Sequence, residues 1–142
     1  MKTIARFVCF GLFLSCATVH AREDMLGTWR GISNSAVLGA GLHHHSPETD
    51  RKAIRFRKVE YTLTIDRQEG RNFSGKITSA QHSEIVIGAL AKDLKSGVMV
   101  NEHGTFNFSR ADSNALELCF TQVHTSNSAI PQVASCFEMT KR

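Results

Sequence analysis

The sequence predicts an all-β protein, a single small antiparallel up-and-down barrel of about eight strands that follows an N-terminal signal peptide. Two patterns support this fold. Glycines and polar clusters interrupt the chain about every 8 to 12 residues, the spacing of short strands joined by turns. No segment sustains the apolar period of about 3.6 residues that marks an amphipathic helix. About eight antiparallel strands can close on themselves and enclose side chains or one small ligand.

Residues 1–21 have the pattern of a secretory signal peptide. Lys2 and Arg6 give the positive start, residues 7–14 form the apolar run, and Val19-His20-Ala21 provides a small-residue cleavage site. The apolar run is far shorter than the roughly 20 residues needed to cross a bilayer. No integral membrane span is therefore expected.

The location predicted from this leader is periplasmic or secreted. Cys16, preceded by Leu14-Ser15, offers a lipoprotein attachment site as an alternative, but Phe13 is bulkier than the residue a bacterial lipoprotein box usually has there. After cleavage, residues 22–142 form a single β-barrel domain, because a chain of this length supports one modest core.

The charge balance does not favour a nucleic-acid partner. Two of the 17 lysines and arginines lie in the leader, so 15 basic residues face 13 acidic ones in the processed chain. Nucleic-acid binding requires clustered basic residues. The one dense basic group, residues 51–58, is interpreted as the solvated start of a strand.

The first two strands are expected on either side of a long loop. Gly27-Thr28-Trp29, which holds the only tryptophan, opens a strand over residues 26–37, and residues 38–52 form the loop. Over residues 59–66 apolar and polar side chains alternate, the period of a half-buried strand.

The alternation of apolar residues changes phase at the start of that second strand. Ile54 and Phe56 occupy even positions, whereas the apolar residues of 59–66 occupy odd ones. A slip of one residue exchanges the two faces of a strand. A bulge or strand break is therefore expected near Arg57-Lys58.

The later strands are shorter. Gly70 serves a turn over residues 67–71, and the run Ile85-Val86-Ile87 favours a strand because β-branched residues fit a pleated surface. Strands are expected over residues 73–77, 84–91, 98–100 and 105–109, followed by two strands that carry Cys119 and Cys136.

Cys119 and Cys136, the two cysteines left after cleavage, are expected to form a disulfide, as pairs in exported proteins usually do. A disulfide needs Cα atoms roughly 4.4–6.8 Å apart. If Cys119 and Cys136 lie directly opposite each other in an antiparallel hairpin, they meet this requirement, and the register of the two strands is then fixed. That register gathers the large apolar residues on one face and the sulfurs on the other. The facing pairs are Leu118 with Phe137, Leu116 with Met139, and Phe120 with Ser135.

The same register has one unfavourable consequence. Glu117 lies opposite Glu138, and like charges directly opposite destabilise a sheet. Either a basic side chain lies between them or the register is shifted. The loop that joins the two strands covers residues 124–132.

Three segments together resemble the first strands of an avidin or streptavidin barrel: Gly27-Thr28-Trp29, Thr62-Leu63-Thr64-Ile65 and residues 70–77. The Gly-x-Trp opening is also similar to that of lipocalins and of bacterial periplasmic metalloprotease inhibitors. The resemblance implies a calycin-like barrel that Trp29 closes against a basic side chain of the last strand, here Lys141 or Arg142. Biotin is not carried over, because avidins line their pocket with further tryptophans and this chain has a single one.

His43-His44-His45 is the most unusual local cluster. Imidazoles bind Zn²⁺ or Cu²⁺, so this loop is a candidate metal site. Adjacent residues of an extended loop cannot all face one ion, so such a site needs His82, His103 or His124 from other loops. The alternatives are a solvated loop and a lid that responds to pH.

Catalytic residues are not expected. The chain has no Gly-x-Ser-x-Gly turn that would expose a nucleophilic serine, and no glycine-rich phosphate loop. Glu117 and Glu138 are interpreted as surface residues screened by water, although a true pair would hold one carboxyl group with a shifted pKa.

The sequence therefore predicts an exported, non-enzymatic binding protein that takes a small apolar or amphipathic ligand inside a β-barrel and needs no cofactor. Two other functions stay open. One is a protein-interaction module, such as an inhibitor of an exported hydrolase or an envelope factor, that binds through residues 38–52 and 124–132. The other is a metal-binding envelope protein that uses His43-His44-His45.

Overall fold

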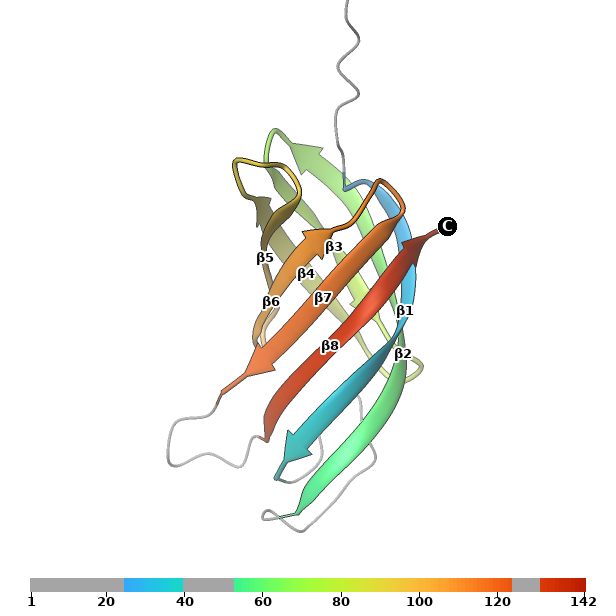
Figure 1. The fold of residues 1–142 in the computed structure, drawn as a ribbon, viewed down its shortest axis with the longest axis vertical. Helices are drawn as coiled ribbons and strands as arrows, with labels where there is room; N and C mark the ends of the chain where they lie inside the picture. Colours follow the sequence, from blue (N-terminus) through green and yellow to red (C-terminus); the bar gives the residue numbers. More distant parts are fainter. Residues whose placement is uncertain (1–24, 40–52, 124–130) are drawn as a thin grey trace, which may run out of the picture.

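The computed structural model describes residues 25–39, 53–123 and 131–142, which form one closed antiparallel barrel (Figure 1). Each strand pairs with the next, and the last pairs with the first. The predicted all-β, up-and-down barrel is confirmed. The eight strands are β1 (Gly27–Leu38), β2 (Ile54–Glu69), β3 (Asn72–Thr78), β4 (Ser83–Leu90), β5 (Ser96–Val100), β6 (Thr105–Arg110), β7 (Ala115–Gln122) and β8 (Gln132–Lys141).

The predicted signal peptide over residues 1–21 and the alternative lipid attachment at Cys16 lie outside the described residues. Across the described ranges, no helix of membrane-spanning length and apolarity is found.

One apolar core fills the barrel between its two ends. Inward and outward side chains alternate strictly along β6 and β8, as a period of two residues requires. The inward side chains meet in a single cluster. Members with no exposed surface are Trp29, Leu63, Val86, Leu118 and Met139.

Trp29 is fully buried near one end of the barrel. Its Nε1 donates a hydrogen bond to the backbone oxygen of Met25 (3.1 Å), and Nζ of Lys141 lies 5.3 Å from the ring centroid. Gly27 has a φ of 119°, and a Cβ there would lie 2.8 Å from Cε of Lys141. Glycine at this position therefore lets the lysine side chain lie across the strand that carries the tryptophan.

The break expected near Arg57-Lys58 is absent, so that prediction was wrong. The pairing of β1 with β2 runs without a shift from Gly27 opposite Ile65 to Leu38 opposite Ile54. Because the pleat is uninterrupted, Ile54 and Phe56 point outward, and 82% of Phe56 is exposed. The irregularity of β2 lies instead between Ile65 and Arg67, where its pairing with β3 shifts.

The disulfide register is confirmed. Cys119 and Cys136 are joined, with Cα atoms 4.1 Å apart, and Leu118 faces Phe137 while the buried Leu116 faces Met139. The register is the unshifted one, so Glu117 does lie opposite Glu138, and both side chains are exposed to water. The hydroxyl of Ser109 on the neighbouring strand donates to Glu117 (3.5 Å).

The end opposite Trp29 is called the open end here. The β3–β4 and β5–β6 connections lie there, because successive strands run in opposite directions. Strands β1 and β2 extend furthest at this end (Figure 1). Most of the two loops predicted over 38–52 and 124–132 lies outside the described residues.

Candidate functional site

A cavity of about 40 Å³ lies inside the barrel toward its open end, and we call it the polar chamber. A water occupies roughly 10–15 Å³ of such a volume, so the chamber holds about three waters or the polar end of a ligand. Part of its lining is apolar and consists of Ile77, Phe106, Phe120, Val133 and Phe137. The polar part, which we call the polar wall, is interleaved with the apolar part around the barrel and consists of Ser33, Ser35, Tyr61, Glu84, Asn101, His103, Gln122 and Ser135.

Three buried serines form a ring of hydroxyl groups on the polar wall. The Oγ of Ser33 shares hydrogen bonds with the Oγ of Ser35 (2.8 Å) and of Ser135 (2.6 Å), and Ser35 donates to Ser135 (3.1 Å). Each hydroxyl has one proton and two lone pairs. The three bonds use all three protons, so the ring offers only acceptors to anything else in the chamber.

Gln122 adds another acceptor. Its side chain is buried at the end of β7, with 5% of the residue exposed. Its Oε1 has no hydrogen-bond partner among the described residues. A buried polar atom without a partner costs on the order of 1–3 kcal/mol. Such an atom beside a cavity marks a position at which a water or a bound molecule can donate a hydrogen bond.

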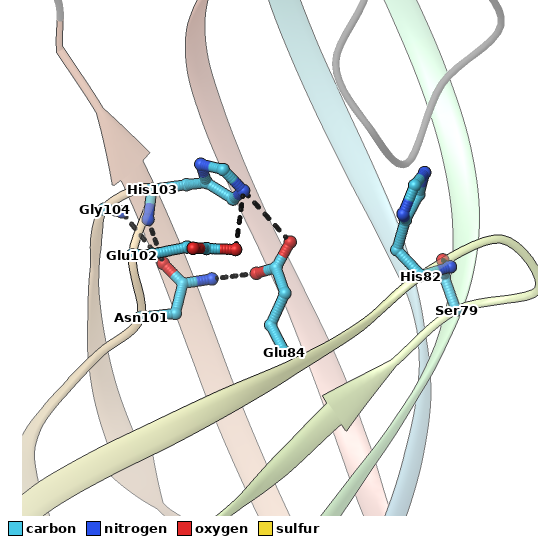
Figure 2. A network of polar contacts seen from close by, with 7 residues as sticks. All are labelled: Ser79, His82, Glu84, Asn101, Glu102, His103 and Gly104. Atoms are coloured by element: carbon cyan, nitrogen blue, oxygen red, sulfur yellow. Dashed lines mark hydrogen bonds and ion pairs between the residues drawn. The ribbon is translucent and has the colours of Figure 1, made fainter.

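A network of Glu84, Asn101, Glu102 and His103 lies beside the chamber (Figure 2), and all of these except Glu102 line it. Nε2 of His103 lies 3.4 Å from Oε1 of Glu84 and 3.4 Å from Oε1 of Glu102. The side-chain amide of Asn101 donates to the other oxygen of Glu84. The Oδ1 of Asn101 accepts from the backbone nitrogens of His103 (3.0 Å) and Gly104 (2.8 Å), which holds the β5–β6 turn in place.

Tyr61 contributes the phenol of the polar wall. Burial, and then the nearby carboxylate of Glu84, raise the pKa of Tyr61 to about 12. The ring stacks on Phe137 with centroids 5.7 Å apart. The neutral phenol is thus favoured in the folded protein.

This pKa predicts a loss of stability at alkaline pH. Between the ordinary value of 10.0 and about 12, the folded protein keeps a proton that the unfolded chain has lost. The stabilisation that the protonated Tyr61 provides is complete below pH 10.0 and is lost as the pH rises through the native pKa of about 12. Tyr61 is the only tyrosine, so tyrosinate absorbance in the near ultraviolet reports this group alone. We expect the native midpoint to lie well above the midpoint in denaturant, and Tyr61→Phe to flatten the stability profile. Equal midpoints would contradict the prediction.

The structure describes some of the sequence-predicted site residues and not others. His43-His44-His45 lie outside the described residues, so the metal prediction for that loop stays a prediction. Of the two cations expected near Trp29, Lys141 lies over the ring, whereas the backbone nitrogen of Arg142 donates to Thr28 (2.9 Å). His103 does lie beside carboxylates, whereas His82 stands apart on the β3–β4 connection in Figure 2.

Sequence reasoning missed the polar wall of the chamber. One signal was present, because Ser33, Ser35 and Ser135 occupy inward positions of strands that are otherwise apolar on that face. Small polar residues at core positions indicate either close packing or a lined cavity. Glu84 gave a second signal, as an acidic residue in phase with the buried Val86.

Comparisons with protein-family models, with curated proteins and with solved structures find no match for this chain. The chain is therefore described by its own fold and site. It is a small disulfide-linked antiparallel β-barrel with a polar chamber at its open end.

Proposed function

We propose that this chain is an exported, non-enzymatic binding protein that takes a small amphipathic ligand in the polar chamber. The observation that carries the proposal is that the lining of the chamber combines aromatic side chains with buried hydrogen-bond acceptors. The disulfide fits an exported protein, since such bonds persist in oxidising compartments.

The polar end of the ligand is expected to donate hydrogen bonds. The three serine hydroxyl groups use their protons in hydrogen bonds to one another. Oε1 of Gln122 has no partner among the described residues, and Glu84 is a buried acid. A primary ammonium group carries three donors and a positive charge. It would satisfy several of these acceptors and lie against the aromatic faces, where cations are attracted.

A wholly apolar ligand fits less well. It would leave the acceptors without partners while removing their access to water, and each such loss costs on the order of 1–3 kcal/mol. The limited volume favours a ligand whose polar end enters the chamber while its apolar part extends toward the open end.

Replacing Gln122 with methionine tests the proposal. The variant removes the unpaired oxygen but keeps the volume, so we expect the ligand-free protein to become more stable by about 1 kcal/mol. Ligand binding should weaken about tenfold, because one acceptor is lost. Calorimetry with hexylamine, hexanol and hexanoate, and urea unfolding of both proteins, measure the two effects.

Gln132→Met is the matched control, because Gln132 is exposed on β8. It should change neither quantity. If hexanoate binds as well as hexylamine, or if none of the three probes binds, the proposed donor-bearing ligand is wrong. If Gln122→Met lowers stability, the premise of an unpaired oxygen is wrong.

A second candidate is binding to another exported protein. It is favoured by outward-facing aliphatic side chains on β4 and β5, where Ile87 lies opposite Val100 and both are exposed. Native mass spectrometry of protein purified from its source separates the candidates. A retained small molecule supports the first, and a stoichiometric protein partner whose binding Ile87→Lys abolishes supports the second.

A further inference from the structure

We propose that Glu84, Glu102 and His103 form a binding site for one divalent transition-metal ion of the Zn²⁺ type beside the polar chamber. The proposed ligands include none of the run His43-His44-His45. It goes beyond the proposed ligand binding, because it requires no molecule in the chamber.

Two of the three distances among the side chains match those around a small ion. Nε2 of His103 lies 3.4 Å from a carboxylate oxygen of each glutamate, and all three atoms lie within 4.8 Å of one another. Ligands around a tetrahedral zinc ion are about 3.3–3.6 Å apart, given metal–ligand bonds of about 2.0–2.2 Å. An ion could therefore be held by small side-chain adjustments, without movement of the barrel.

The cluster gathers negative charge that a bound cation would offset. Two carboxylates approach the same ring nitrogen, and only 6% of the Glu84 side chain is exposed. Burial away from water strengthens the attraction between such carboxylates and a divalent ion. A ligating imidazole coordinates through a ring nitrogen that carries no hydrogen, so the ion takes that position on Nε2.

The chemistry of the donors selects the class of metal. One imidazole and two carboxylates suit Zn²⁺ and its neighbours in the first row, whereas Ca²⁺ and Mg²⁺ prefer sites built wholly from oxygen. Three protein ligands leave a fourth position for water or a ligand. Gln122 lines the same chamber, and its Oε1, which has no partner within the described part of the chain, offers an acceptor for a water held there.

Asn101 is the positioning residue of this site. Its Oδ1 holds the backbone of the turn that carries Glu102 and His103, and its amide donates to the oxygen of Glu84 that does not face His103. Hydrogen bonds that orient metal ligands typically account for 10- to 100-fold in affinity. The two elements of the site, the start of β4 and the β5–β6 turn, are thus linked by one side chain.

Calorimetric titration with Zn²⁺ alone tests the proposal in the full processed chain. We use a background in which His43, His44 and His45 are replaced by alanine, so that this run cannot contribute. We expect one Zn²⁺ per chain in this background. His103→Ala and Glu84→Gln should each weaken binding on the order of 100-fold or more, and Asn101→Ala about 10- to 100-fold.

Two further variants keep the result interpretable. Glu102→Gln changes an exposed side chain that the fold does not need, so it should weaken binding without affecting the barrel, as circular dichroism would verify. His82→Ala removes another imidazole near the open end and should leave the affinity unchanged. If Zn²⁺ binding disappears with the three-histidine replacement, or persists unchanged in Glu84→Gln and Glu102→Gln, the proposed site is overturned.

Discussion

Replacing Trp29 with alanine is expected to destabilise the barrel by about 3–5 kcal/mol, the usual cost of removing a large buried aromatic side chain. The indole has no exposed surface and is the only tryptophan. Its loss opens a cavity at this end of the barrel, frees the backbone oxygen of Met25 from its hydrogen bond, and removes the ring beneath Lys141. Urea unfolding followed by far-ultraviolet circular dichroism measures the effect, since the variant lacks tryptophan fluorescence.

Two milder variants separate these contributions. Trp29→Phe keeps an aromatic ring but loses the Nε1 donor and part of the volume, so its cost should lie between zero and that of alanine. Lys141→Met keeps the side-chain length and removes only the cation, with an expected cost of about 0.5–2 kcal/mol. A cost below about 1 kcal/mol for Trp29→Ala would show that the tryptophan does not close the barrel.

Removing the disulfide by the double change Cys119→Ser and Cys136→Ser is expected to destabilise the protein by about 3 kcal/mol. The two residues are 17 positions apart, and a crosslink that closes a loop of this size restricts the unfolded chain by about that amount in the chain-entropy model. The loss acts on the unfolded state, so the pairing of β7 with β8 should survive in the folded variant.

Reduction of the unmodified protein is the control for this double variant. It should give a similar loss, since both routes remove the same crosslink, whereas the reducing agent should leave the double variant unchanged. An unaltered unfolding midpoint in the reduced protein would contradict the predicted effect.

The fold was predictable because the strand pattern and the cysteines constrain it independently. Alternation identifies which faces are buried, and a cross-strand disulfide between Cys119 and Cys136 fixes the register of one hairpin. Phe56 shows where this reasoning fails. Its hydrophobicity predicted an inward position, but unbroken pairing with β1 forces it outward, because the ladder of backbone hydrogen bonds constrains a long strand more than one exposed ring does.

The site was less predictable because it joins residues far apart in the sequence. Ser33 and Ser135 meet only when β1 pairs with β8, and Glu84 meets His103 only when β4 and β5 form their hairpin. The sequence drew attention to the conspicuous run at His43, whereas the described cluster uses a single histidine. Isolated polar residues can be recognised as one site only after the fold of the barrel shows that they lie close together.

The pairing of the first strand with the last also determines when the barrel can form. Ser35 and Ser135 are neighbours in the sheet although 100 residues separate them in the chain. Contacts of such long range make folding slow, on the order of milliseconds to seconds. While the chain is being synthesised, β1 lacks one neighbour and Trp29 lacks its lysine until β8 emerges. For the export proposed above, this delay would keep the chain loose enough to pass through a translocation pore before it folds.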